Sequence, residues 1–257
     1  ESTRMTSTLS ADLATLKAEY DERGFLVVPS LFSLAEIAAV SQRTDEIAQH
    51  PESAAPGIKI GREGDTQKDK TAGALSPVRG IAFPVRFDPI FRELATAPKL
   101  LALARALVGP RIKLFRDQML LKPPGGQAKP IHQDQSYFRV LPMDAVMTAW
   151  VALDEATQEN GCMCYVPGSH RYGIFPVTPD PVRPVHHIPD TGSLALPAAV
   201  ACPVPAGSVI FHHGCTLHYS QDNHTRTWRR ALILHFTSAE AQSEIAGLNR
   251  EVSLEID

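Results

Sequence analysis

The amino-acid sequence predicts an α+β protein whose core is a β-sandwich or jelly roll. Helical periodicity prevails up to about residue 108, whereas short strand-like runs bounded by turn residues prevail from there to about residue 237. Helices followed by strands are typical of α+β folds rather than of alternating α/β folds. The 257 residues suffice for one domain with a substantial core. We therefore expect a single domain over residues 1–257, with a helical portion at about 10–108, a strand-rich core at about 109–237 and a helical C-terminal tail.

The N-terminal portion carries several helix signals. Ser33 and Glu36 form a capping-box pattern ahead of an apolar run, and Gly24 is placed to end the first helix. Residues 51–76 are rich in Pro, Gly and charge, so we interpret them as a loop and a candidate lid. The predicted helices are residues 10–22, 34–49 and 88–107, the last interrupted near Pro98.

The later part of the chain carries strand signals. The Asn160-Gly161 pair is a hairpin-like turn into a further apolar run, and residues 173–200 read as a Pro-rich loop. The predicted strands are residues 24–30, 111–122, 145–153, 207–213, 215–220 and 228–236.

Composition excludes several classes of protein. The formal net charge of -3 and the lack of a basic excess argue against nucleic-acid binding. No apolar run approaches the roughly 20 residues of a membrane span, and the N-terminus lacks the apolar region of a secretory signal. The four cysteines lack the spacing of a structural zinc site, which predicts reduced, buried thiols. We expect a cytoplasmic protein with a small-molecule substrate; the oligomeric state cannot be read from the sequence.

The most informative short motif is His132-Gln-Asp134. On a strand, these two side chains would share one face, so an imidazole and a carboxylate could bind one side of a metal ion. A second histidine from elsewhere would complete the two-histidine, one-carboxylate set of non-haem iron(II) oxygenases. The motif alone is weak, because 10 His and 28 acidic residues give about one such match by chance. Indeed His50-Pro-Glu52 is a second match, which we interpret as a solvated surface pair.

The order of motifs around His132 resembles the phytanoyl-CoA dioxygenase family of iron(II) and 2-oxoglutarate oxygenases. The resemblance covers nearly the whole chain, including the GFLVVP segment that begins at Gly24. It implies a double-stranded β-helix (jelly-roll, cupin-like) core with N-terminal and flanking helices. The matching segments are RDQMLLKPPG (116–125), PIHQDQSYF (130–138), TAWVALD (148–154), ENGCMCYVPGSHR (159–171), GSVIF (207–211) and HYS (218–220), followed by Asn223 and Arg229.

The resemblance also implies the metal ligands. His132 and Asp134 correspond to the proximal pair and His218 to the distal histidine. His212 and His213 compete with His218 for that role, but only His218 has the family's Ser two residues later and Arg eleven residues later. A further histidine within an apolar strand, His235, reads as a core or pocket residue.

The same resemblance implies a co-substrate site. Arg229 and Ser220 would bind the distal carboxylate of 2-oxoglutarate, with Arg226 and Arg230 as alternatives to Arg229. Neighbouring strand residues face opposite sides, so Arg229 and Arg230 cannot both point inward. A lysine of the family falls near Gly80 and is missing here, which leaves the adjacent Arg79 as a candidate substitute. The pocket wall is implied to include Trp150, Gln118 and Met119.

The implied function is a dioxygenase that uses Fe(II), 2-oxoglutarate and O2, releases succinate and CO2, and is assisted in vitro by ascorbate. Related halogenases replace the carboxylate ligand by a small residue, so Asp134 favours hydroxylation or a related oxidation. The substrate class expected is a specialised metabolite or lipid-like acid, although the cations of loop 51–76 fit a solvated loop as well as an anionic substrate. One alternative is a cupin-type metal-dependent isomerase or hydrolase that does not use 2-oxoglutarate. Another is a binding protein without turnover.

Overall fold

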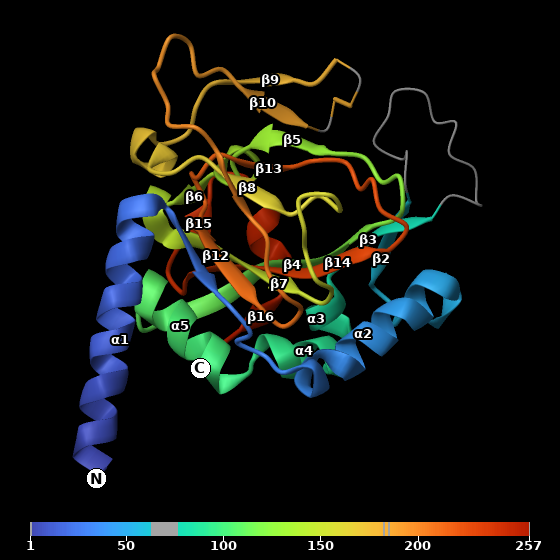
Figure 1. The fold of residues 1–257 in the computed structure, drawn as a ribbon, viewed down its shortest axis with the longest axis horizontal. Coiled ribbons are helices and arrows are strands. Elements are labelled where there is room, and N and C mark those ends of the chain that lie inside the picture. The colour runs from blue at the N-terminus through green and yellow to red at the C-terminus, as the bar shows by residue number, and fades with distance from the viewer. Residues whose placement is uncertain (1, 63–76, 182, 185, 257) are drawn as a thin grey trace.

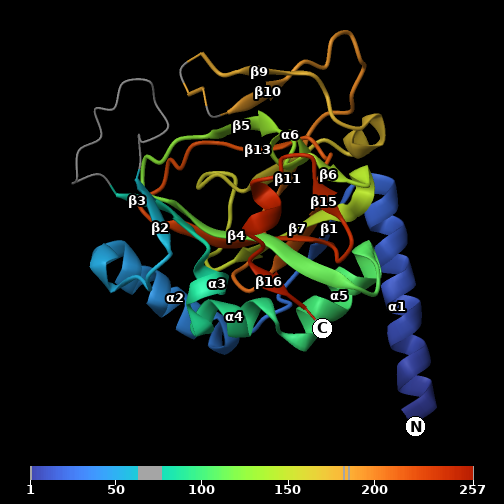
Figure 2. The same ribbon diagram turned by 180° about the vertical axis from the view of Figure 1, so that it is seen from behind.

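The predicted α+β jelly roll is confirmed in a computed structural model, which describes residues 2–62, 77–181, 183–184 and 186–256. Two antiparallel sheets face each other, and helices cover the outer face of the larger sheet (Figures 1 and 2). The N-terminal helix lies along one side of the molecule in both views. Most of the histidines named above lie in the space between the two sheets.

The larger sheet carries the strands most distant in sequence. Its order is β1-β12-β7-β14-β4-β3-β2, with β16 paired to β4. Arg229 opposes Lys122 in the long β14–β4 pair, which forms the centre of this sheet. The strand bounds are β1 Phe25–Val28, β2 Lys59–Arg62, β3 Val78–Ala82, β4 Ile112–Lys122, β7 Val146–Ala152, β12 Val209–His213, β14 Arg229–Ser238 and β16 Leu254–Glu255.

The smaller sheet has the order β11-β8-β13-β5 and closes the barrel over the larger one. A hairpin of β9 and β10 lies beyond β5, on the side away from the helices (Figure 1). A further short pair joins β6 to β15. The strand bounds are β5 Lys129–His132, β6 Val140–Leu141, β8 Met163–Tyr165, β9 Val177–Pro179, β10 His187–Pro189, β11 Val200–Cys202, β13 His218–Ser220 and β15 Gln242–Ser243.

The predicted helices are present, and their ends follow local chemistry. The Ser33 hydroxyl caps α2 by accepting a hydrogen bond from the Glu36 backbone, and the Glu36 carboxylate accepts one from the Ser33 backbone, so the capping box is confirmed. Pro98 begins α5, which explains the predicted interruption. The helix bounds are α1 Ser2–Arg23, α2 Leu34–Gln49, α3 Pro84–Phe87, α4 Pro89–Ala95, α5 Pro98–Val108 and α6 Gln135–Phe138, with 3₁₀ turns η1 Pro51–Ser53, η2 Met143–Ala145, η3 Ser169–Tyr172 and η4 Leu248–Arg250.

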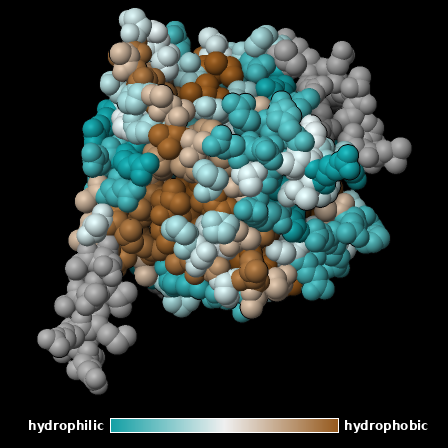
Figure 3. Space-filling view, in the orientation of Figure 1, coloured by the Kyte–Doolittle hydropathy of each residue, from teal (hydrophilic) through white to brown (hydrophobic). Residues whose placement is uncertain are grey.

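The hydrophobic core lies mainly between the helices and the outer face of the larger sheet. Leu232, Leu234 and Phe236 of β14 are buried there in one cluster with residues of α2, α4 and α5. A smaller apolar cluster, which includes Trp150 and Ile233, fills part of the space between the two sheets. Figure 3 shows hydrophobic residues gathered next to α1 and hydrophilic residues over the opposite side of the same face. The helices therefore pack on the outer face of the larger sheet, and its inner face lines a cavity.

Three expectations for the loops and the C-terminus are wrong, wholly or in part. Residues 239–256 form two short strands and one 3₁₀ turn, because Leu254 pairs with Leu114 of β4 in extended conformation instead of continuing a helix. The Pro-rich segment 173–200 contains β9, β10 and the start of β11. Part of the predicted 51–76 loop is β2, and residues 63–76 lie outside the described residues.

Two further findings concern membrane spans and cysteines. Among the described residues, no helix is long and apolar enough to cross a bilayer. All four cysteines are buried and form no disulfide bond, as the sequence predicts. The cysteine framework therefore contributes no cross-link to the fold.

Candidate active site

The three predicted metal ligands come together between the sheets. His218 of β13 lies directly opposite His132 of β5 in the smaller sheet. The Asp134 Oδ1 atom lies 3.8 Å from His132 Nε2 and 3.6 Å from His218 Nε2. Ligands bound about 2 Å from one ion lie roughly 3–4 Å apart, so these atoms are spaced to hold a metal. All three side chains are buried.

The turn after β5, rather than a shared strand face, brings Asp134 beside His132. The strand ends at His132, and Asp134 has helical backbone angles at the start of α6. Gln133 between them is buried, and its amide donates to the carbonyls of Gly173 and Cys215, both at 2.7 Å. The sequence-based reason for their proximity was therefore wrong, although the proximity itself is present.

Backbone carbonyls orient both histidines. The Nδ1 atom of His132 lies 2.8 Å from the carbonyl of Pro130, and that of His218 lies 2.9 Å from the carbonyl of Thr216. These contacts place the proton on Nδ1 and leave the Nε2 lone pair facing Asp134. Burial lowers the pKa of His132 well below its usual value, which keeps this imidazole neutral and able to bind a metal.

The second oxygen of Asp134 is held by a network of hydrogen bonds. Oδ2 accepts from the Thr148 hydroxyl at 2.6 Å and from His212 Nε2 at 3.0 Å. His235 Nδ1 lies 2.8 Å from that hydroxyl, and the Tyr165 hydroxyl lies 3.1 Å from His212 Nδ1. Burial alone would raise the pKa of Asp134, but the surrounding imidazoles and the His212 bond outweigh it and hold this pKa well below its usual range.

The two histidines that compete with His218 are placed differently. His212 points at Asp134 Oδ2 and does not join the group of three ligand atoms. His213, its neighbour on β12, faces the other way and accepts a hydrogen bond from the Cys215 backbone at 3.0 Å. The chance match at His50 and Glu52 is an exposed pair 3.4 Å apart, as the sequence predicts.

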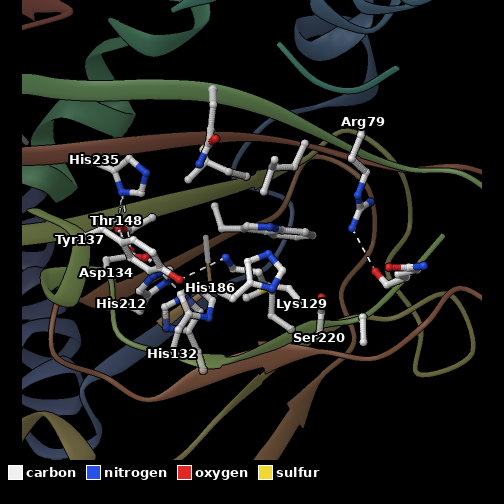
Figure 4. A pocket seen from close by; sticks show the side chains of 18 of the residues that line it. Arg79, Lys129, His132, Asp134, Tyr137, Thr148, His186, His212, Ser220 and His235 are labelled. Atoms are coloured by element: carbon white, nitrogen blue, oxygen red, sulfur yellow. Dashed lines mark hydrogen bonds and ion pairs between the residues drawn. The ribbon is translucent and has the colours of Figure 1, made fainter. Parts of the chain in front are cut away.

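A cavity of about 440 Å³ adjoins the metal-ligand group (Figure 4). Its size falls in the range of small-molecule sites. The predicted residues Arg229, Ser220, Trp150 and Gln118 line it. Met119 does not: it is buried in the core on the opposite side of β4. The prediction for Met119 was wrong because neighbouring residues of a strand face opposite sides.

The side chain of Arg229 is a buried cation for which the described residues supply no anionic partner. Within the described residues it has no hydrogen-bond or ion-pair partner, and its buried Nε atom is unsatisfied. Its guanidinium lies 5.4 Å from the Trp150 ring. Burial, and then the charge of Arg79, lowers the pKa of Arg229 to about 9, so the group is still charged at neutral pH. A partnerless buried charge is costly, which fits a site whose missing anion is a ligand.

The surroundings of Arg229 fit a carboxylate. The Ser220 hydroxyl accepts from the buried ammonium of Lys122 at 2.9 Å, so its own hydrogen remains available for a ligand. Arg79 of β3 also lines the cavity, and it donates to the carbonyls of Leu121 at 2.7 Å and Gln127 at 3.0 Å. The predicted substitute for the family's lysine therefore reaches the pocket.

Several residues of the site escaped sequence reasoning. Thr148 and His212, which donate hydrogen bonds to Asp134, lie within apolar runs that indicate buried strands. The sequence indicated His212 only as a competitor of His218 for the metal. The cavity also contains Lys129 on β5 and two residues of the β9–β10 connection, Arg183 and His186. A basic residue three positions before the H-x-D motif was the available signal for Lys129.

The chain is similar to known oxygenases over most of its length. A family model described as phytanoyl-CoA dioxygenase (PhyH) matches residues 20–231. Human peroxisomal phytanoyl-CoA dioxygenase is 27% identical over 256 residues, which cover 95% of this chain and 75% of the human protein.

Solved structures give the same picture. The epimerase SnoN in complex with Fe3+, alpha ketoglutarate and nogalamycin RO superposes with a TM-score of 0.70 at 28% identity, covering 93% of this chain and 90% of SnoN. The non-heme alpha ketoglutarate dependent carbocyclase SnoK from nogalamycin biosynthesis gives a TM-score of 0.69 at 25% identity, covering 95% and 92%. With most of the chain matched by the family model, and the motif order and fold in agreement, the chain belongs to the phytanoyl-CoA dioxygenase family.

Proposed function

We propose that this protein is an Fe(II)- and 2-oxoglutarate-dependent dioxygenase that hydroxylates a small molecule. The observation that carries the proposal is the joint presence, in one cavity, of two ligand-ready histidines with a carboxylate and of a partnerless buried arginine. A metal-dependent isomerase or hydrolase would need the metal ligands but would not require the partnerless arginine. The family membership and the ligands in the SnoN complex support the same assignment.

The residues of the chain would divide the work as follows. His132, Asp134 and His218 hold iron(II) on one face, and the hydrogen bonds from Thr148 and His212 fix the carboxylate in place. When bound, iron(II) supplies the activation of O2 that couples the conversion of 2-oxoglutarate to succinate and CO2 with oxidation of the substrate.

The co-substrate would lie between the metal ligands and Arg229. The guanidinium pairs with the distal carboxylate, to which Ser220 adds a hydroxyl hydrogen bond, and Trp150 forms an apolar wall. Because Arg229 and Trp150 are buried, the low-dielectric surroundings would strengthen this charge pairing.

The fate of the substrate is the finer part of the proposal. Asp134 occupies the ligand position that halogenases leave open, which favours transfer of a hydroxyl group. The likeness to an epimerase and a carbocyclase supports a second candidate, in which the same site leads to a stereochemical or ring-forming oxidation. Product analysis by mass spectrometry separates these outcomes, since only hydroxylation adds one oxygen atom.

The central test is co-substrate binding and turnover. We expect the anaerobic enzyme with iron(II) to bind 2-oxoglutarate, with a visible absorption band of the complex, and the aerobic enzyme with ascorbate and a substrate panel to form succinate. The alternative of a cupin-type isomerase or hydrolase predicts no affinity for 2-oxoglutarate. Failure of iron(II) to promote 2-oxoglutarate binding would overturn the proposal.

A further inference from the structure

The cavity contains more positive charge than the proposed reaction needs. Its described lining includes four arginines and one lysine, but a single carboxylate, that of Asp134. Iron(II) and Arg229 together would be balanced by Asp134 and the two carboxylates of 2-oxoglutarate. Arg183 has Asp180 at 3.8 Å. Arg79 donates to the carbonyls of Leu121 and Gln127. The charge of Lys129 is balanced neither by the metal ligands, nor by the co-substrate, nor by Asp180.

Lys129 lies in a position where an unbalanced charge is costly. Its side chain points into the cavity towards Tyr137, whose hydroxyl is 3.5 Å from the ammonium (Figure 4). No carboxylate lies within ion-pair distance of Lys129 among the described residues. Burial lowers the pKa of Lys129 to about 8, with further lowering from Arg183 and Arg79 against an opposing effect of Asp134. A second anion beside Lys129 would relieve this cost.

Two other polar groups around Lys129 have unused hydrogen-bonding capacity. The Tyr137 hydroxyl accepts from the His187 backbone at 2.9 Å, which leaves its own hydrogen free to donate. The side chain of His186 is 9% exposed, and its buried Nδ1 has no hydrogen-bond partner. Both side chains line the cavity. An ammonium, a phenol hydrogen and an imidazole nitrogen around one space are suited to an oxyanion.

The β9–β10 hairpin holds this part of the cavity in place. The His187 ring stacks on Tyr137 with centroids 4.2 Å apart and an interplanar angle of 10°. Arg183 donates to the carbonyl of Ala128, next to Lys129, at 2.9 Å. The Tyr137 ring also lies 6.0 Å from the ring of the metal ligand His132. A group bound here would lie beside the metal ligand His132, between β5 and the β9–β10 hairpin.

We propose that Lys129, Tyr137 and His186 form a subsite for an oxyanion, a carboxylate or a phosphate, on the substrate that is oxidised. This inference rests on the proposed function, since it assigns 2-oxoglutarate to Arg229 and the substrate to Lys129. Because the subsite adjoins His132, the carbon presented to the metal lies within a few bonds of the oxyanion. The substrate is then a small acid rather than a neutral molecule.

The test uses probes of equal chain length and different charge. Calorimetry measures binding of hexanoate, hexyl phosphate and the neutral hexanamide to the anaerobic full-length enzyme loaded with iron(II) and saturating 2-oxoglutarate. We expect at least one anion to bind about tenfold or more tightly than hexanamide, a difference of about 1.4 kcal/mol. The better of the two anions identifies the carboxylate or phosphate class.

Variants assign that preference to the subsite. Lys129→Met should remove most of it, Lys129→Arg should retain it, and Lys17→Met, at an exposed ion pair on α1, should leave it unchanged. The absorption band of the bound 2-oxoglutarate should be the same in all four proteins. That band also reports whether a variant folds and loads its cofactors.

The outcomes separate this inference from the proposed function. Loss of 2-oxoglutarate binding in Lys129→Met would assign the lysine to the co-substrate and overturn the inference alone. Equal binding of hexanamide and both anions by the wild-type enzyme, or an unchanged preference in Lys129→Met, would also overturn it. Absence of the 2-oxoglutarate band in the wild-type enzyme would instead overturn the proposed function.

Discussion

Each of the two faces of strand β14 carries an arginine, but the described part of the protein supplies acidic partners only on the outer face. On the outer face, Arg230 pairs with Asp154 at 2.7 Å and Asp45 at 2.6 Å, and leucines continue the strand into the core. On the inner face, its neighbour Arg229 has no such partner among the described residues, and His235 lines the cavity. The contrast is in the partners, since both arginines are largely buried.

This difference shows which positive charge the protein balances itself and which one a ligand would balance. The outer charges are satisfied by the chain itself, so the pKa of Arg230 is raised, chiefly by its bond to Asp154. The inner charge is unsatisfied, so burial lowers the pKa of Arg229 to about 9. We expect substitutions on the outer face to change stability and substitutions on the inner face to change binding.

The largest effect is expected at the metal ligands. His218→Ala should abolish iron(II) binding and reduce turnover at least about 1,000-fold, because one of only three protein ligands is lost. Succinate formation and anaerobic metal titration measure these effects. His50→Ala, in the exposed H-x-E match, is the matched control and should behave as wild type. Full turnover by His218→Ala would show that the distal ligand lies elsewhere.

The two arginines provide the direct test of the comparison. Arg229→Gln should weaken 2-oxoglutarate binding about 100-fold, or about 2.7 kcal/mol, while leaving the unliganded fold as stable or more stable. Arg230→Gln should lower the free energy of unfolding by about 1 kcal/mol and leave that affinity unchanged. Urea unfolding and 2-oxoglutarate titration of both variants give the four values. The reverse pattern would contradict the assignment of the two faces.

A smaller effect is expected from the network that supports Asp134. Thr148→Val and His212→Phe each remove a donor to Oδ2, and either should weaken iron(II) binding by about 10- to 100-fold. His213→Phe, one residue away on the opposite face, should leave metal affinity near wild type. Metal titration with a competing chelator measures all three. Equal losses in His212→Phe and His213→Phe would indicate a general disturbance of β12.

The cavity should also differ from the outer face in its response to pH. Lys129 faces Asp134, Arg183, Arg79, His186 and the Tyr137 hydroxyl, and its pKa is lowered to about 8. A base with a lowered pKa keeps its charge at pH 7 and loses it as the pH rises through that value. The preference for hexanoate over hexanamide should therefore decline by several-fold between about pH 7 and pH 9. A preference independent of pH would exclude Lys129 as its source.

The smallest effect is expected far from the cavity. Ser33→Ala removes the cap of α2 and should lower the free energy of unfolding by about 1 kcal/mol. Thermal unfolding measures the loss. Because α2 packs on the outer face of the larger sheet, the affinities for iron(II) and 2-oxoglutarate should not change; a change in either would mean that the outer layer also tunes the site.

Local sequence signals predicted much of the fold. The capping box of Ser33 and Glu36, the helix break at Pro98 and the alternation of Arg229 with Arg230 depend on neighbours within a few residues. The same alternation should have excluded Met119, which was assigned with Gln118 to one wall. The C-terminal tail was wrong because pairing with β4, at Leu114 over a hundred residues earlier, decides its conformation.

The sequence predicted the site residues that belong to a motif. It did not predict the roles of residues that are positioned by the pairing of strands distant in the sequence. The metal-ligand trio follows from motif order, although the turn at Asp134 did not. Nothing local marks Thr148 or His212 as supports of Asp134, since β7 and β12 acquire that role only when they pair in the larger sheet. The positions of Lys129 and His186 likewise depend on how the hairpin packs over β5.

The pairing of β1 with β12 has a consequence for folding. Phe25 lies opposite His212, so the residue that supports Asp134 is held by a strand almost 190 positions earlier in the chain. Contacts of such sequence separation carry a high loop-closure cost and form slowly. We expect iron(II) affinity to return last during refolding, after most helical signal has been regained. Recovery of metal binding would then report that β1 has paired with β12.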